Sequence, residues 1–267
     1  MGLHQNRLVV KVGASTLTNE LGACELRAFD RLARVLSDLR NAGHEIILVS
    51  SGAIAAGMYH CSTRERPSGT WRRQAAAALG QCSIMHLYYR FFSHYGTTIA
   101  QILLKAEDVE QKGRSDRLTN TFHTLLNMGV IPIVNENDAV LCTEDGPAGR
   151  RFADNARLSA AVAELCRAKR LVILSGISGL YDTGPKWNPG AKRGRQAGRR
   201  DGAGFPLAGS AGARRGTGGM EAKLQAAKLA AAHGIDTIIA SGKTPEILYA
   251  IMQGREEGTF FPGRPGA

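Results

Sequence analysis

The residues of this sequence best suited to phosphate chemistry stand in a late segment, residues 216–227. Its first half is a glycine loop whose backbone can approach a ligand closely, and its second half is a run of strong helix formers. A glycine loop that enters a helix N-terminus presents free N–H groups and a partial positive charge, which suit a phosphate group. Lys223 stands one turn into this helix and can lean back over the same site. Taken alone, the segment is equally consistent with an ordinary helix N-terminus that follows flexible glycines.

A second cation, Lys11, stands inside an apolar run, residues 7–12, that predicts a β-strand. A lysine that faces solvent from an edge strand would be the simplest explanation. However, Lys11 lies at the C-terminal end of the run, beside Gly13, where open α/β sheets bind their ligands. This position favours a functional cation.

Other predicted strands also end in polar or glycine-rich turns. The carboxyl ends of parallel strands meet at one edge of a sheet, so such turns are expected to lie close together. Asp154 and Asn155 precede a predicted helix at 157–167, and either side chain could cap its N-terminus. In isolation, each polar turn is as well explained by ordinary chain reversal. The strand-end turns are Ser51-Gly52, Asn135-Glu136-Asn137-Asp138 and Ser175-Gly176.

The elements that must position these residues alternate between strand and helix along the whole chain. Alternation of this kind predicts an α/β fold, a three-layer α/β/α sandwich with a mainly parallel open sheet. The predicted strands cover residues 7–12, 45–50, 98–104, 130–134, 171–174, 237–240 and, as a short edge strand, 259–261. The predicted helices cover residues 25–42, 74–95, 117–128, 157–167 and 246–253, together with the helix that follows the late glycine loop.

Composition restricts the class of protein. The five cysteines are scattered and form no Cys-x-x-Cys pair, which argues against a disulfide framework or a structural zinc site. The sequence runs from Met1 almost directly into the first strand pattern, without an apolar leader or a segment long enough to span a bilayer. We therefore expect a cytoplasmic protein without a membrane partner.

The net charge of +11 is concentrated in one segment. Residues 183–215 contain eight Lys or Arg against Asp201 alone, so this segment carries +7 of the total. It is also rich in Gly and Ala and has few large apolar residues, which predicts a mobile basic insertion. A folded basic face for nucleic acid is therefore disfavoured.

The turns form a set that resembles the glutamate 5-kinase family of the amino acid kinase superfamily. The resemblance is carried by VVKVG at 9–13, SSGAIAAG at 50–57, NEND at 135–138 and GTGGMEAKLQAA at 216–227. It runs from about residue 8 to about residue 261 and so covers nearly the whole chain. Many bacterial members carry a further C-terminal domain of RNA-binding type, so this sequence resembles a short form. The resemblance implies one domain, 1–267, with a glutamate-binding lobe at about 1–170 and a nucleotide-binding lobe at about 171–261.

The implied activity is ATP-dependent phosphorylation of the γ-carboxylate of L-glutamate to L-glutamyl 5-phosphate, the first step of proline biosynthesis. Lys11 and Lys223 would be the catalytic cations, and Mg²⁺ would arrive with ATP, not in a metal site of the protein. The implied glutamate-binding residues are Ser51, Gly52, Asp138 and Asn155. The implied nucleotide-binding residues are Lys11, Gly13, Ser175, Gly176, Thr217, Gly218, Gly219, Met220, Glu221, Ala222 and Lys223. The family also implies a homo-oligomer, a dimer or tetramer, with proline as a candidate feedback inhibitor.

The sequence departs from the family pattern in three ways. One is the basic segment 183–215, where the family usually has more ordinary helical sequence, and the other two are single positions. The family motif Asp-Asn-Asp is Asp154-Asn155-Ala156 in this sequence, and the missing carboxylate is expected to organise the two lysines. The family pair Thr-Asp is Ser175-Gly176, which lacks another carboxylate. The alternative to an active kinase is therefore a weakened paralogue that binds an amino acid or a nucleotide as a regulator. An RNA-binding protein that uses the basic insertion is the least favoured alternative.

Overall fold

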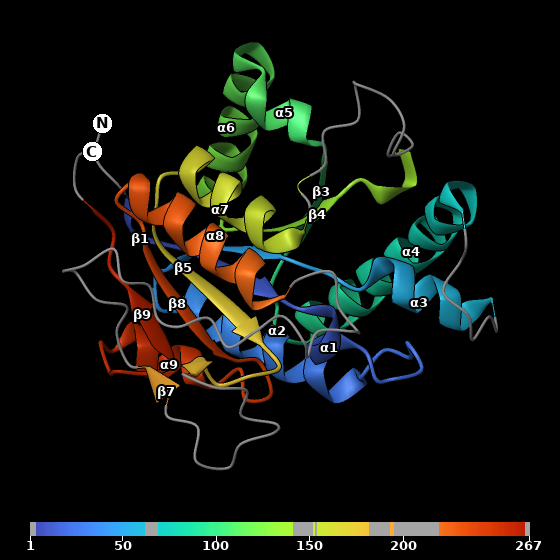
Figure 1. The fold of residues 1–267 in the computed structure, drawn as a ribbon, viewed down its shortest axis with the longest axis horizontal. Helices are drawn as coiled ribbons and strands as arrows, with labels where there is room; N and C mark the ends of the chain where they lie inside the picture. The colour runs from blue at the N-terminus through green and yellow to red at the C-terminus, as the bar shows by residue number, and fades with distance from the viewer. Residues whose placement is uncertain are drawn as a thin grey trace.

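A seven-stranded sheet forms the centre of the computed structural model, which describes residues 4–61, 69–140, 152, 154–181, 193–194 and 219–264. The strand order is β3-β4-β2-β1-β5-β8-β9. Strands β5 and β8 lie side by side in the ribbon of Figure 1. All neighbours pair in parallel except β9, which runs antiparallel to β8 at one edge. The strands are β1 (His4–Val12), β2 (Glu45–Val49), β3 (Ile99–Leu104), β4 (Ile131–Glu136), β5 (Ala168–Ser175), β8 (Asp236–Ser241) and β9 (Thr259–Phe261).

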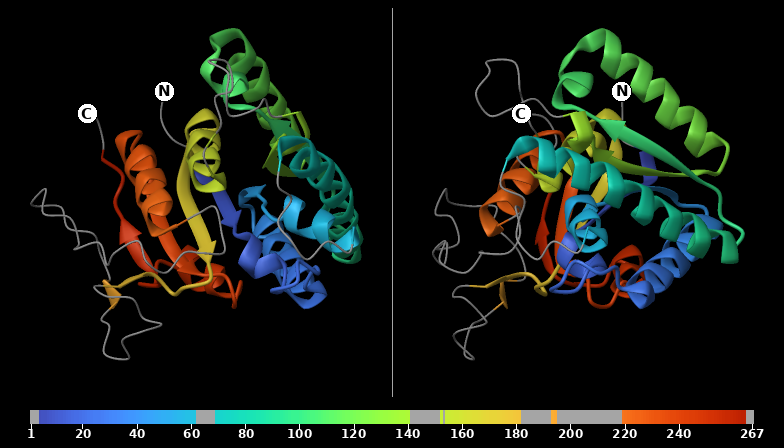
Figure 2. Two further views of the ribbon diagram at one scale, coloured as in Figure 1. Left: turned by 45° about the vertical axis from the view of Figure 1, so that its right-hand side comes forward. Right: turned by 90° about the vertical axis from the view of Figure 1, so that its right-hand side faces the viewer.

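Helices cover both faces of this sheet, which confirms the predicted three-layer α/β/α fold (Figures 1 and 2). Each face has its own apolar core, because successive residues of a strand point to opposite faces. The first face is covered by α1 (Ala14–Leu17), α2 (Leu26–Asn41), α3 (Ala53–His60), α4 (Thr70–His94) and α9 (Ile247–Met252). The second face is covered by α5 (Ala106–Glu110), α6 (Lys112–Asn127), α7 (Asn155–Leu165) and α8 (Met220–Ala232).

The alternation along β1 determines where its one lysine points. Leu8, Val10 and Val12 belong to the core of the first face, whereas Val9 belongs to the core of the second. Lys11 follows Val9 by two residues, so its side chain points toward the second face, where α7 and α8 lie. Helix α7 packs against both β1 and α8, and α7 and α8 lie side by side in Figure 1.

Helices α3 and α4 approach each other closely because glycines line their contact. A methyl group on Gly80 of α4 would lie 1.7 Å from the carbonyl oxygen of Ala53, and one on Gly57 of α3 would lie 1.8 Å from that of Ala76. Any larger side chain would push the helices apart. This packing fixes α3 directly after the turn at Ser51 and Gly52.

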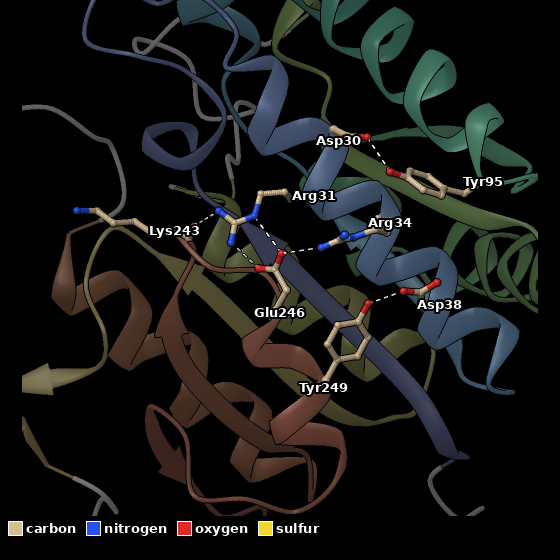
Figure 3. A network of polar contacts seen from close by, with 8 residues as sticks. All are labelled: Asp30, Arg31, Arg34, Asp38, Tyr95, Lys243, Glu246 and Tyr249. Atoms are coloured by element: carbon tan, nitrogen blue, oxygen red, sulfur yellow. Dashed lines mark hydrogen bonds and ion pairs between the residues drawn. The ribbon is translucent and has the colours of Figure 1, made fainter.

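Helix α9 is held to α2 by a polar network on the surface of the first face (Figure 3). Glu246, at the start of α9, accepts hydrogen bonds from Arg31 at 2.7 and 3.0 Å and from Arg34 at 3.1 Å. Arg31 also donates to the carbonyl oxygen of Lys243, at 3.2 Å. Tyr249 of α9 donates to Asp38, at 2.5 Å. These contacts tie the C-terminal end of the fold to its N-terminal half.

Several element boundaries differ from the prediction. The short helices α1 and α5 were not predicted. Helix α7 begins two residues earlier than predicted because Asp154 caps it. Within the predicted basic insertion, β7 (Arg193–Gly194) pairs antiparallel with β6 (Leu180–Tyr181), and the remainder of residues 183–215 lies outside the described residues. In the described part of the chain, no helix combines the length and apolar character needed to cross a membrane.

Candidate active site at the carboxyl edge of the sheet

Lys11 is a buried cation on a central strand. Because β1 pairs with both β2 and β5, the interpretation of Lys11 as a solvent-facing lysine on an edge strand is wrong. The residue is only 6% exposed, and its Nζ lies 3.7 Å from the point where a methyl group on Gly13 would sit. Burial lowers the pKa of Lys11 to about 8, the charge of Lys223 acts in the same direction, and the charge of Asp154 opposes both.

Lys223 lies in the first turn of α8. Its Nζ reaches back to within 3.5 Å of the carbonyl oxygen of Gly219, the N-cap residue of the helix. Burial lowers the pKa of Lys223, and the charge of Asp154 raises it. Gly219 has no side chain to cap the helix, so the N–H groups of the first turn are available to a ligand.

Asp154 is a buried carboxylate at the N-terminus of α7. Its Oδ1 accepts hydrogen bonds from the backbone N–H groups of Ala156, at 2.7 Å, and Arg157, at 3.1 Å. The residue is 7% exposed, and its Oδ2 has no hydrogen-bond partner among the residues that the structure describes. Its charge acts on both Lys11 and Lys223, so the three groups share one region of the site.

A second polar group lies around Asn155, the first residue of α7. Its Nδ2 is within hydrogen-bond distance of Ser51 Oγ and Asn135 Oδ1, both at 2.9 Å, and of the carbonyl oxygen of Ser50, at 2.5 Å. Asn135 in turn donates to Gln81 of α4, at 2.9 Å. The ends of β2 and β4 and the start of α7 are thus brought together by amide and hydroxyl groups.

Two features shape the chain around this polar group. Gly52 has a φ of 99°, a left-handed conformation that side chains rarely adopt, and it lets the chain turn from Ser51 directly into α3. Asp138 lies on the 3-10 turn η1 (Asp138–Val140), which follows β4 and packs against α4. It is half-buried.

Backbone hydrogen bonds connect the carboxyl ends of β1, β5 and β8. Gly13 donates from its N–H to the carbonyl oxygen of Leu174, at 3.3 Å, and Gly242 donates to that of Ser175, at 2.7 Å. Ser175 is buried, whereas Gly176 is exposed. These two hydrogen bonds join the segments that follow β1 and β8 to the carboxyl end of β5.

Residues 6–241 match the pattern of the family described as "Amino acid kinase family". This chain belongs to the amino acid kinase family. Among its relatives, a protein named "Glutamate 5-kinase" from Clostridium perfringens is 45% identical over 260 residues, which cover 97% of this chain and 96% of the relative. Another of that name, from Carboxydothermus hydrogenoformans, is 46% identical over 96% of this chain and 67% of the relative.

Solved structures of two other kinases share the fold at low sequence identity. UMP kinase from Bacillus anthracis superimposes with a TM-score of 0.65 at 15% identity, covering 97% of each chain. Isopentenyl phosphate kinase from T. acidophilum gives a TM-score of 0.66 at 16% identity, covering 96% of this chain and 99% of its own. The three-layer architecture is therefore that of the amino acid kinase fold.

The structure brings most residues of the predicted kinase site to one edge of the sheet. Ser51 and Asn155 are hydrogen-bonded, and the charges of Lys11 and Lys223 interact. Ser175, Gly176 and Gly13 lie at strand ends, and Gly219 begins α8. Met220, Glu221 and Ala222 form the first turn of α8. Thr217 and Gly218 lie outside the described residues.

Some residues at this edge were not in the predicted site. Asp154 was predicted only as a possible helix cap, and Asn135 and Gln81 were not assigned to the substrate. At the nucleotide side, a methyl group on Gly242 would lie 2.6 Å from Thr16 Oγ1, so α1 packs directly on the turn after β8. Gly242 could have been found, because it follows a predicted strand in the same way as Gly13. Gln81 has no such signal, since it lies within a long helix.

The two single-residue departures from the family pattern have different surroundings. Ala156 is fully buried in the apolar core of the second face. Gly176 is exposed, and a methyl group there would lie 3.5 Å from Ser15 Oγ. In the described ranges, no group of three or more His, Cys, Asp or Glu residues could hold a metal ion.

Proposed function

We propose that this chain transfers the γ-phosphoryl group of ATP to the γ-carboxylate of L-glutamate, and so catalyses the first step of proline biosynthesis. The observation that carries the proposal is the pair formed by the buried Lys11 and the half-buried Lys223, whose charges interact at the edge of the sheet that also holds the polar group around Asn155. The identity of 45% to a relative named "Glutamate 5-kinase", over nearly the full length of both proteins, supports glutamate as the substrate.

The reaction joins two anions, so its barrier is largely electrostatic. One oxygen of the γ-carboxylate attacks the γ-phosphorus, the bond from phosphorus to the bridging oxygen of ADP breaks, and that electron pair leaves with ADP. Catalysis of such a transfer consists chiefly of positioning and charge stabilisation. Lys11 would contact the transferring phosphoryl group, and Lys223 would contact the nucleotide phosphates. Because the pKa of Lys11 is about 8, its ammonium group is mostly charged at neutral pH.

The two substrates would approach from opposite sides of the lysine pair. Glutamate would bind Ser51, Gly52 and Asn155, with Asp138 suited to its α-ammonium group. ATP would bind across the strand ends at Gly13 and Ser175-Gly176. Its phosphates would meet the loop 217–219 and the first turn of α8, residues 220–223. Mg²⁺ would enter as part of the ATP substrate.

This assignment divides the single domain into a glutamate-binding lobe of about residues 1–170 and a nucleotide-binding lobe of about residues 171–261. A homo-oligomer and inhibition by proline are further proposals that come with the glutamate 5-kinase assignment. Size-exclusion chromatography with light scattering tests the first, and initial rates measured with added proline test the second.

Trapping of the acyl phosphate tests the proposed function. The full chain is incubated with Mg·ATP and, in parallel, with L-glutamate, L-aspartate or N-acetyl-L-glutamate, and hydroxylamine converts any acyl phosphate to a coloured hydroxamate. We expect hydroxamate to form in proportion to ADP with L-glutamate and much less with the other two acids. ADP without hydroxamate, or a preference for another acid, would refute the proposal. Normal ATP binding without glutamate-dependent turnover would instead support a regulatory paralogue.

A further inference from the structure

A buried ammonium group, that of Lys11, and a half-buried one, that of Lys223, share one site and repel each other. This repulsion and burial both favour loss of a proton from Lys11. A lysine that loses its proton cannot stabilise a phosphoryl group. Where the family pattern places a carboxylate, this chain has Ala156, whose methyl group is fully buried in the core.

The negative charge of Asp154 can offset this repulsion, because the residue lies near both lysines. It caps α7, and α7 packs on both β1 and α8, the two elements that carry the lysines. Two backbone N–H groups, those of Ala156 and Arg157, hold its Oδ1 and so fix the orientation of the carboxylate. Oδ2 is buried and has no hydrogen-bond partner among the described residues, although a buried carboxylate oxygen normally has one.

Capping of α7 accounts for the contacts of Oδ1 but does not explain why the capping side chain is charged. Ser, Thr and Asn cap helices as well as Asp does and bring no charge into a buried site. Among the described residues, the charged groups near the start of α7 include Arg157 of α7 itself, Lys11 from β1, Lys223 from α8 and Glu136 from β4, whose Oε1 accepts the N–H of Phe152. A negative charge at Asp154 is therefore explained by the two lysines.

We propose that Asp154 is a positioning residue that holds the ammonium groups of Lys11 and Lys223 charged and in place for phosphoryl transfer, in addition to capping α7. The inference rests on the proposed function, because it assigns the two lysines to the transferred phosphate. It also explains how the site operates with Ala156: the negative charge is supplied two residues earlier, from the cap position of the same helix.

The Asp154→Asn substitution separates the two roles, because Asn still caps a helix but carries no charge. We expect kcat to fall about 100-fold, as on loss of one preorganised electrostatic partner, with the KM for glutamate changed far less. The melting temperature should stay within a few degrees of that of the unmodified protein. Asp154→Ser, whose hydroxyl group also caps, should show the same loss of kcat and provides the test if the Asn variant folds poorly.

Asp236→Asn is the matched control at the opposite edge of the sheet. Asp236 also accepts a backbone N–H, from Gly263 at 2.9 Å, and lies 3.6 Å from a lysine, Lys169. Its substitution should leave kcat unchanged. Equal loss of kcat in both variants would show that removal of any such carboxylate disturbs the protein, and would overturn the proposal.

The pKa of Lys11 gives a second readout that does not depend on turnover. It can be followed by NMR of ¹⁵N-lysine-labelled protein, with the signal assigned by its loss in Lys11→Met. In Asp154→Asn the pKa of Lys11 should fall, because a charge that raised it has been removed. An unchanged pKa, or a kcat within about threefold of the unmodified protein, would overturn the role of Asp154. Absence of glutamate-dependent turnover in the unmodified protein would instead refute the proposed function, and the titration would still decide the role of Asp154.

Discussion

Strand β1 carries a buried cation at each end, and the two have opposite surroundings. At the amino end, Arg7 is 1% exposed, and its Nε donates to Glu45 at 2.9 Å. Its Nη1 also donates to the carbonyl oxygen of Cys166, at 2.5 Å. At the carboxyl end, Lys11 is 6% exposed and lies near a second cation, Lys223, with the carboxylate of Asp154 acting on both.

Under the proposed function, the difference separates a structural charge, Arg7, from a functional one, Lys11. Arg7 has the partners that a buried charge needs in the folded protein, so the pair with Glu45 can serve the fold alone. At the other end, the two ammonium groups exceed the charge of Asp154, and an arrangement of this kind is stabilised when an anion binds. Strongly perturbed lysines at the carboxyl edge of a parallel sheet are typical of functional sites.

The largest expected effect comes from removing either lysine. Lys11→Met and Lys223→Met should each lower kcat by at least about 100-fold, because each removes a preorganised charge from the transition state. Neither should lower the free energy of unfolding, since Met fills a similar volume without a buried charge. Initial rates at saturating substrates, together with urea unfolding, measure both quantities. Retention of kcat within a few-fold would mean that these lysines do not act on phosphate.

The opposite pattern is expected at Arg7. Arg7→Met should lower the free energy of unfolding by about 3 kcal/mol, because it leaves Glu45 without its ion-pair partner in a half-buried position. The kcat of the folded protein should not change. Urea unfolding and rates normalised to folded protein provide the test. A large loss of kcat with unchanged stability would contradict the division between the two ends of β1.

The pH dependence of kcat/KM for ATP should reveal the lowered pKa of Lys11. The folded protein has a Lys11 pKa of about 8, so kcat/KM for ATP should fall as the pH rises through about 8, when the ammonium group loses its proton. In Lys223→Met the residual activity should decline at a higher pH, because the neighbouring charge that lowered the pKa is gone. A profile that stays flat to pH 9.5 would contradict the assignment of Lys11.

The smallest effect is expected at the surface network between α2 and α9 (Figure 3). Glu246→Gln weakens the ion pairs to Arg31 and Arg34, whose side chains are largely exposed. Exposed pairs contribute about 1 kcal/mol or less, so the free energy of unfolding should fall by no more than that. The kcat should not change. A loss of unfolding free energy comparable with that of Arg7→Met would show that the exposure of an ion pair does not determine how much it stabilises this protein.

The sequence was sufficient to predict the layers of the fold. Strands buried on both faces are near-continuous apolar runs, and the long helices carry a clear apolar periodicity, so both are visible in the sequence. The turns α1 and α5 were missed because four or five residues are too few to show a helical period. The pairing of β6 with β7 was missed because strands of two residues have no pattern.

The candidate site was predicted less completely than the fold. The rule that ligands bind at the carboxyl ends of parallel strands selected Lys11, Ser51 and Ser175. Asp154 was missed because its position before a helix is explained by capping alone. Only the three-dimensional structure shows that its second oxygen has no hydrogen-bond partner among the described residues. Gln81 was missed because its contact with Asn135 joins residues far apart in the sequence.

Oxygen transfer from labelled glutamate tests most directly whether this edge of the sheet moves a phosphoryl group onto a carboxylate. L-glutamate labelled with ¹⁸O in its γ-carboxylate is incubated with Mg·ATP and the unmodified protein. The glutamyl phosphate then cyclises as its amine attacks the acyl carbon, so phosphate departs with the former carboxylate oxygen. We predict inorganic phosphate that contains one ¹⁸O atom, visible by its isotope shift in ³¹P NMR. Unlabelled phosphate would mean that water accepts the phosphoryl group, and would contradict the proposed reaction.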